Sequence, residues 1–191
     1  MNVAILLIIY KAYGVGMFKK LYSRITILLL CLFLTMVSSC TPDIQPRGEL
    51  ITDQTFKTSF ANFKAVTFAS YNDYEIGPAK VRFYLLRNEQ VIFEFPELYI
   101  HSGNWSFESL KAISFKDVNS DGLKDVIIIA DYVTGIGPTG MIPFLVAGVY
   151  LQQEGKFISD NKINKILNAQ NNYSKIKTTS DVSALLENNK E

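Results

Sequence analysis

Four oxygen-bearing side chains recur in one short acidic stretch, and their spacing is that of ligands for a metal ion. Positions 1, 3, 5 and 9 of its D-x-N-x-D-G-x-x-D pattern are Asp117, Asn119, Asp121 and Asp125. Gly122 at position 6 allows a sharp turn that other residues resist. A hard cation such as Ca2+ takes six to eight oxygens from short side chains and backbone carbonyls. The pattern therefore predicts a calcium loop, in which the ion would neutralise three mutually repelling carboxylates.

Two strands are expected to hold this loop. Lys111 to Phe115 leads into it, and the apolar run from Val126 to Ala130 leaves it. That run lacks the alternation of a half-exposed strand, so we expect a central strand covered on both faces. Position 12 of the pattern is Ile128, which excludes an EF-hand because that loop ends in a ligating glutamate between two helices. The alternative to a metal site is a polar turn whose aspartates stay solvated.

The stretch FKDVNSDGLKDVIII, residues 115–129, resembles the strand-loop-strand calcium repeat of the FG-GAP or VCBS family, the integrin-like repeats of many bacterial surface proteins. The resemblance implies calcium ligands at Asp117, Asn119, Asp121, Asp125 and the carbonyl of Leu123. Such repeats usually come in series and build propellers of about four or more four-stranded blades. The chain shows one copy, so it is similar to single-repeat, VCBS-like lipoproteins, and a full propeller is not expected.

The first part of the chain has the layout of a bacterial secretory signal. Met17 to Ser39 combines a basic start, an apolar core and small residues ahead of Cys40. Val37 to Cys40 resembles a lipobox, which implies cleavage before Cys40 and a lipid on that cysteine. The apolar part, Ile25 to Ser39, is shorter than the roughly 20 residues that a membrane-spanning helix needs. We therefore predict a signal peptide at 1–39, with Met17 as the true start.

The expected mature protein is a single domain on a short tether. Residues 40–50 carry two prolines and predict a lipidated tether, and residues 51–191 predict one globular domain. After cleavage the chain would have 15 Lys and Arg and 18 Asp and Glu, a formal net charge of −3. No nucleic-acid partner is therefore expected. Thr41, rather than an aspartate, follows the cysteine. The resemblance to lipoprotein sorting signals then implies the outer membrane in a host with two membranes. The predicted location is the cell envelope, facing the periplasm or the cell surface.

The remaining pattern predicts an α+β domain that is rich in β-structure, with one small antiparallel sheet and short helices at its N- and C-terminal ends. Phe56, Phe60 and Phe63 stand at helical spacing and predict an amphipathic helix over 53–64. Further elements are a hairpin of Lys80–Leu86 with Gln90–Phe95, strands at 65–71 and 144–151, and two helices capped by Ser159 or Asp160 and by Ser180.

A loop rich in glycine and proline follows the expected central strand. It is a candidate binding surface for a macromolecule or a glycan, through Thr134, Gly135, Gly137, Pro138 and Gly140. The loop lacks the lysine and the serine or threonine that end a phosphate-binding P-loop, so no nucleotide is expected.

Two functions fit these residues. The first is a non-enzymatic, calcium-binding envelope lipoprotein that binds a macromolecule or glycan, with a protective or inhibitory variant. It agrees with a chain that has no G-x-S-x-G or H-E-x-x-H motif. The alternative is a metal-dependent hydrolase that uses the loop from Asp117 to Asp125, with Asp131 or His101 as the general base. His101 has no partner at zinc-ligand spacing, and Trp105 is expected in the core.

Overall fold

The computed structural model describes residues 44–98, 105–169 and 175–189. Contacts divide the chain into two units, Met1–Pro42 and Asp43–Glu191, and the described residues all belong to the second unit. The predicted signal peptide, the lipidation site Cys40 and His101 lie outside the described residues. None of the helices in the described part combines the length and the apolar character that crossing a membrane requires.

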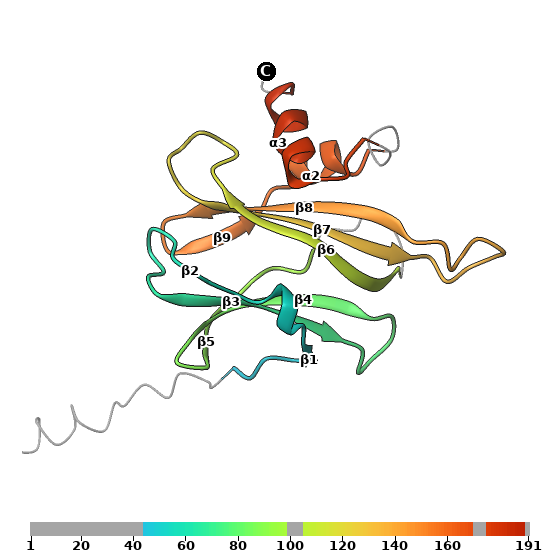
Figure 1. Ribbon diagram of the computed structural model, residues 1–191, viewed down its shortest axis with the longest axis horizontal. Helices are drawn as coiled ribbons and strands as arrows, with labels where there is room; N and C mark the ends of the chain where they lie inside the picture. Colours follow the sequence, from blue (N-terminus) through green and yellow to red (C-terminus); the bar gives the residue numbers. More distant parts are fainter. Residues whose placement is uncertain (1–43, 99–104, 170–174, 190–191) are drawn as a thin grey trace, which may run out of the picture. The chain divides into compact units, whose positions relative to one another are not determined.

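Two antiparallel sheets face one another, and two short helices cover the outer side of the second sheet (Figure 1). The expectation of a β-rich domain is confirmed, with two sheets in place of the single small sheet that the sequence predicted. The elements are β1 (Glu49–Leu50), a 3-10 turn η1 (Thr52–Gln54), β2 (Phe56–Thr58), β3 (Val66–Asp73), β4 (Lys80–Arg87), β5 (Gln90–Glu94), β6 (Ser106–Lys116), β7 (Asp125–Val133), β8 (Phe144–Gln153), β9 (Lys156–Ser159), α2 (Asn161–Leu167) and α3 (Thr179–Glu187).

The first sheet has the strand order β1-β3-β4-β5, and β2 also pairs with β3. Because β4 pairs along the whole of β3 on one edge, β1 and β2 share the other edge. β4 and β5 form the hairpin that the sequence predicted. Its turn residues Asn88 and Glu89 have φ angles of 51° and 68°, which the tight turns of such hairpins require.

The second sheet is a meander in the order β6-β7-β8-β9. Every residue of β7 is buried, which confirms the prediction of a central strand covered on both faces. The first sheet covers one face, and α2 and α3 cover the other (Figure 1). β7 therefore ties together the two cores of the domain.

The core between the two sheets is largely aromatic. Phe95 lies 5.3 Å and 5.1 Å from the rings of Phe68 and Phe93 in the first sheet. The same ring lies 5.1 Å and 4.8 Å from Tyr150 and Phe157 in the second sheet. Edge-on and tilted pairs of this kind add to the stabilisation that comes from burial alone.

The two helices that pack on the second sheet both have an N-cap side chain that accepts backbone N–H groups of the first turn. The Asp160 carboxylate accepts hydrogen bonds from the N–H groups of Lys162 and Ile163, at 2.7 and 3.0 Å, as predicted for the first cap. The second cap is Thr178, two residues before the predicted Ser180. Thr178 forms a capping box with Asp181, and this reciprocal pair satisfies two N–H groups that a single serine could not.

The predicted helix over 53–64 is wrong. Only Thr52–Gln54 is helical, and Phe56–Thr58 pairs with β3 as a strand. Phe60 is 1% exposed, and its N–H donates to the Phe63 carbonyl at 2.9 Å, so a turn brings Phe63 back to the core. A strand followed by a turn thus puts the same phenylalanines on one side, and pairing with β3 decides between the two conformations.

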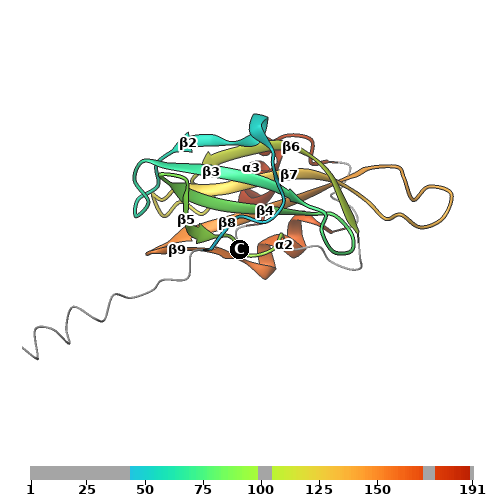
Figure 2. The ribbon, with the colours of Figure 1, turned by 90° about the horizontal axis from the view of Figure 1, so that it is seen from below.

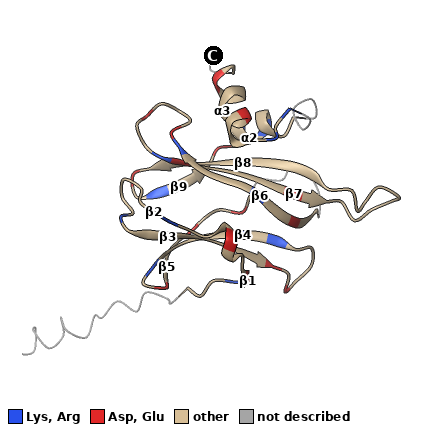
Figure 3. Ribbon diagram, in the orientation of Figure 1, with Lys and Arg blue, Asp and Glu red and all other residues tan. Residues whose placement is uncertain are grey.

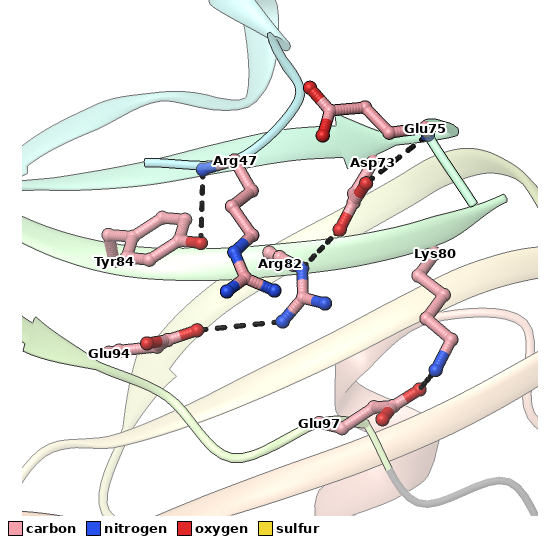
Figure 4. A network of polar contacts seen from close by, with 8 residues as sticks. All are labelled: Arg47, Asp73, Glu75, Lys80, Arg82, Tyr84, Glu94 and Glu97. Carbon is pink, nitrogen blue, oxygen red and sulfur yellow. Dashed lines mark hydrogen bonds and ion pairs between the residues drawn. The ribbon is translucent and has the colours of Figure 1, made fainter. Parts of the chain in front are cut away.

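A polar network holds the start of the described chain against the outer face of the first sheet (Figure 4). The Arg47 N–H donates to the Tyr84 hydroxyl at 3.2 Å. Arg82 pairs with Asp73 and, at 3.5 Å, with Glu94. The hydrogen bond from Arg82 lowers the pKa of Asp73. The Arg47 contact attaches the predicted tether to β4, and the Arg82 pairs join β3, β4 and β5 beside it.

Candidate metal-binding loop

The acidic stretch is the connection between β6 and β7. Lys116 and Asp125 are the last pair of the ladder, and residues 117–124 form the turn beyond it. The structure thus places the predicted loop between two strands of one hairpin. The positive φ angles of Ser120 and Gly122, 67° and 84°, allow the backbone to curl there.

The Asp117 carboxylate accepts hydrogen bonds from three backbone N–H groups of the loop. One carboxylate oxygen, Oδ1, accepts hydrogen bonds from the N–H groups of Ser120 at 2.7 Å and Asp121 at 3.3 Å. The other, Oδ2, accepts from the Gly122 N–H at 2.8 Å. These bonds, that from Gly122 above all, hold the pKa of Asp117 below its usual range.

Asn119 and Asp121 are exposed and bind one another. The Asn119 amide donates to Asp121 Oδ2 at 2.9 Å, and its oxygen accepts from the Asp121 N–H at 3.1 Å. Asp121 Oδ1 accepts from the Leu123 N–H at 2.7 Å. The first three predicted ligands are therefore gathered on one curled segment of backbone.

Asp125 lies in a different environment, because its side chain is fully buried. Its Oδ2 accepts from the Val118 N–H at 2.9 Å, and its Oδ1 accepts from the Gln152 N–H at 2.8 Å. Burial raises the pKa of Asp125, and the nearby charges of Asp121 and Asp117 raise it further. This carboxylate connects the loop to β8 across the sheet.

Gln152 is a positioning residue that the sequence did not reveal. In the amide orientation that satisfies both partners, its nitrogen donates to the Lys124 carbonyl and its oxygen accepts from the Ala61 N–H, each at 3.0 Å. Gln152 is fully buried and thus ties the end of the loop to the segment after β2. A polar residue near the end of a strand usually indicates exposure, so no local signal marked its role.

The donor set suits a hard cation. Carboxylate, carboxamide and carbonyl oxygens are the ligands that Ca2+ takes. Asp117 Oδ2 and both carboxylate oxygens of Asp121 accept one hydrogen bond each and keep a second lone pair, whereas Asp117 Oδ1 accepts two. In the described ranges no three or more His, Cys, Asp or Glu side chains converge as a ready-made metal cluster. The carbonyl of Leu123 belongs to the same turn and would complete the predicted set.

The glycine-rich loop connects β7 to β8 at the opposite end of the second sheet from the acidic loop. Gly135 and Gly137 have φ angles of 68° and 75°, and the Gly135 N–H donates to the Gly140 carbonyl at 2.9 Å. The large side chains exposed on this loop are apolar, and none of them is one of the aromatic or amide groups that commonly contact sugars; they are those of Ile136, Met141 and Ile142.

Of the two residues considered as general bases, Asp131 does not lie beside the acidic loop. Asp131 pairs with Lys111 at 2.7 Å, near the far end of β7 from Asp125, and His101 is among the residues that the structure does not describe. Trp105 is half-buried and its ring lies 4.7 Å from that of Phe144.

Comparisons of the chain with protein-family models, with curated proteins and with solved structures found no match.

Proposed function

We propose that this chain is a calcium-binding lipoprotein of the cell envelope, in which a β-sandwich held by a lipidated Cys40 serves as a binding module for a macromolecule. The observation that carries the proposal is the curled loop between β6 and β7. It holds Asp117, Asn119 and Asp121 on one curled segment, and the third carboxylate, that of Asp125, is buried and accepts a hydrogen bond from the Val118 N–H of the same loop. The signal-like N-terminal segment supports the location.

Calcium would act on stability through charge. The negative charges of Asp117 and Asp121 disfavour ionisation of Asp125, and a bound divalent cation offsets that repulsion. The loop closes the hairpin that contains the central strand β7, so its order is coupled to the order of both cores. An ion that binds only the folded state stabilises it by about 2.7 kcal/mol when its free concentration is a hundredfold above Kd.

We expect Asp121→Ala to abolish the increase in melting temperature that calcium gives the wild-type domain. Asp121 is exposed, so the variant should stay folded in chelator. The control is Glu108→Ala, which removes an exposed carboxylate from the other end of β6 and should keep the full response. Thermal unfolding in calcium and in chelator measures both. A wild-type domain whose melting temperature is the same in the two conditions would contradict the calcium site.

The lipid anchor has its own test. We expect Cys40→Ala to move the protein from the membrane to the soluble fraction, because the sulfur that would carry the lipid is gone. Cys31→Ala is the matched control, since the chain has two cysteines and Cys31 lies inside the predicted signal. Fractionation and the mass of the mature protein measure the outcome. A wild-type mature protein whose mass includes no lipid refutes the anchor.

A further inference from the structure

The largest exposed apolar side chains gather on two loops. Among the described residues, the five most exposed large hydrophobic side chains are Ile76 (89%), Ile136 (81%), Met141 (75%), Ile142 (63%) and Tyr74 (58%). The first and last belong to the turn between β3 and β4, and the others to the loop between β7 and β8. Isolated exposed apolar residues are normal on a protein surface, but a cluster of this kind marks an interaction site.

Both loops project from the same end of the sandwich (Figures 1 and 2). The Phe107 N–H donates to the Ala79 carbonyl at 2.7 Å, and the Ala79 N–H donates to the Ser106 hydroxyl at 3.1 Å. Ser106 pairs with Val133, the last residue of β7 before its loop. A chain of contacts therefore connects the bases of the two loops across the gap between the sheets.

The loop between β7 and β8 carries no charge and is preorganised. From Tyr132 to Gln153 the chain has no acidic or basic residue, so the whole projection is uncharged (Figure 3). The Ile142 N–H donates to the Thr139 carbonyl at 3.0 Å, and other N–H groups of the loop bond within it. A Cβ on Gly140 would lie 2.4 Å from the Ile136 nitrogen, so glycine permits this fold. Internal bonding lowers the cost of moving backbone into an apolar medium.

We propose that these two loops insert their apolar side chains into the surface of the lipid bilayer that holds the lipidated Cys40. The inference rests on the proposed anchor. Arg47 follows Cys40 by seven positions, and an extended segment of seven residues spans at most about 25 Å. Arg47 is fixed at Tyr84, which pairs with Ala69, four residues or about 13 Å along β3 from Asp73 and the turn that follows it.

The anchor is thus long enough to reach the plane of the apolar end and too short to let the domain leave the membrane surface. A bilayer accepts aliphatic side chains without a complementary pocket, which suits an uncharged loop with three separate aliphatic residues. Interfacial insertion also tolerates the single acidic group of the two loops, Glu75, which stays in the headgroup region next to Tyr74.

The test places a fluorescent probe at the loop in the full, lipidated protein. In that form the Cys40 sulfur carries the lipid and Cys31 has left with the signal, so Met141→Cys supplies the single free thiol. An environment-sensitive dye there should shift to shorter wavelength and be quenched by lipid-borne quenchers in vesicles of phosphatidylethanolamine and phosphatidylglycerol. The control is Ile92→Cys on β5, a partly exposed apolar position of the first sheet that should show neither change.

A second arm separates failure of this inference from failure of the anchor. Residues 41–191, which contain both described cores, are held on nickel-chelating vesicles by a histidine tag in place of the lipid. The dye at position 141 should again shift to shorter wavelength and be quenched by lipid-borne quenchers. The double variant Ile136→Ser, Ile142→Ser should reduce this quenching about tenfold or more. Equal signals at positions 141 and 92 in both arms would overturn the inference. A change at 141 that requires added envelope protein would assign the loop to a protein partner instead.

Discussion

Asp125→Ala is expected to lower the free energy of unfolding by roughly 2–4 kcal/mol in the absence of calcium, because it leaves the buried N–H groups of Val118 and Gln152 without acceptors. That loss is large for a domain whose total stability is about 5–15 kcal/mol. Urea unfolding of the two proteins in chelator measures it. Asp121→Ala, which removes an exposed carboxylate from the same loop, is the control and should lose far less in chelator.

The pH dependence of this effect follows from the raised pKa of Asp125. Its folded pKa lies above the unfolded value of about 3.9. Without calcium, its contribution to stability is therefore full below that unfolded value and is lost as pH rises through the folded pKa. Asp125→Asn removes this loss of stability with rising pH, because asparagine does not ionise. It also leaves one buried N–H group facing the NH2 of the amide. The free energy of unfolding of the wild type and of the asparagine variant is measured across the pH range above about 3.9. A wild type that gains stability relative to the variant as pH rises would contradict a raised pKa for Asp125.

Phe95→Ala is expected to destabilise the domain by about 3–5 kcal/mol, because it opens a cavity where the two sheets meet. The Phe95 side chain is 5% exposed, and it contacts aromatic rings of both sheets, among them Phe68 and Phe157. Its loss should therefore weaken the contact between the two sheets. In urea unfolding, the midpoint should fall while the slope of the unfolding free energy against urea concentration stays the same.

Ile92→Ala is the matched control for this cavity. Ile92 lies three residues earlier at 37% exposure, so its truncation should cost much less. Equal losses for the two variants would show that the sheets are not held together by this aromatic cluster.

Local sequence pattern was sufficient where one element and its immediate neighbours decide the structure. The apolar run from Val126 to Ala130 predicted a buried central strand, and β7 is buried along its whole length. The hairpin of β4 and β5 also follows from two β-prone runs and a short turn, because the pairing partners are close in sequence. Binding of calcium by the loop that β7 completes stays a prediction.

Contacts between segments that are distant in the sequence decided the conformation of residues 56–63 and the hydrogen bonds of Asp125 and Gln152. Phe56, Phe60 and Phe63 suit a helix or a strand and turn equally well, and pairing with β3 selects the second. The hydrogen bond between the Asp125 carboxylate and Gln152 depends on β8, because Gln152 lies in that strand, 27 positions further along the chain.

The sequence by itself determined the hairpin of β4 and β5, the buried run of β7, the turn of the acidic loop and the place where a secretory signal is expected, because side-chain period and turn residues act locally. Only the tertiary structure decided that Asp125 is buried and that Ile76 and Ile136 share one end of the domain. The physical reason is that exposure depends on what packs against a side chain. In this fold the packing comes from a second sheet whose register no local pattern specifies.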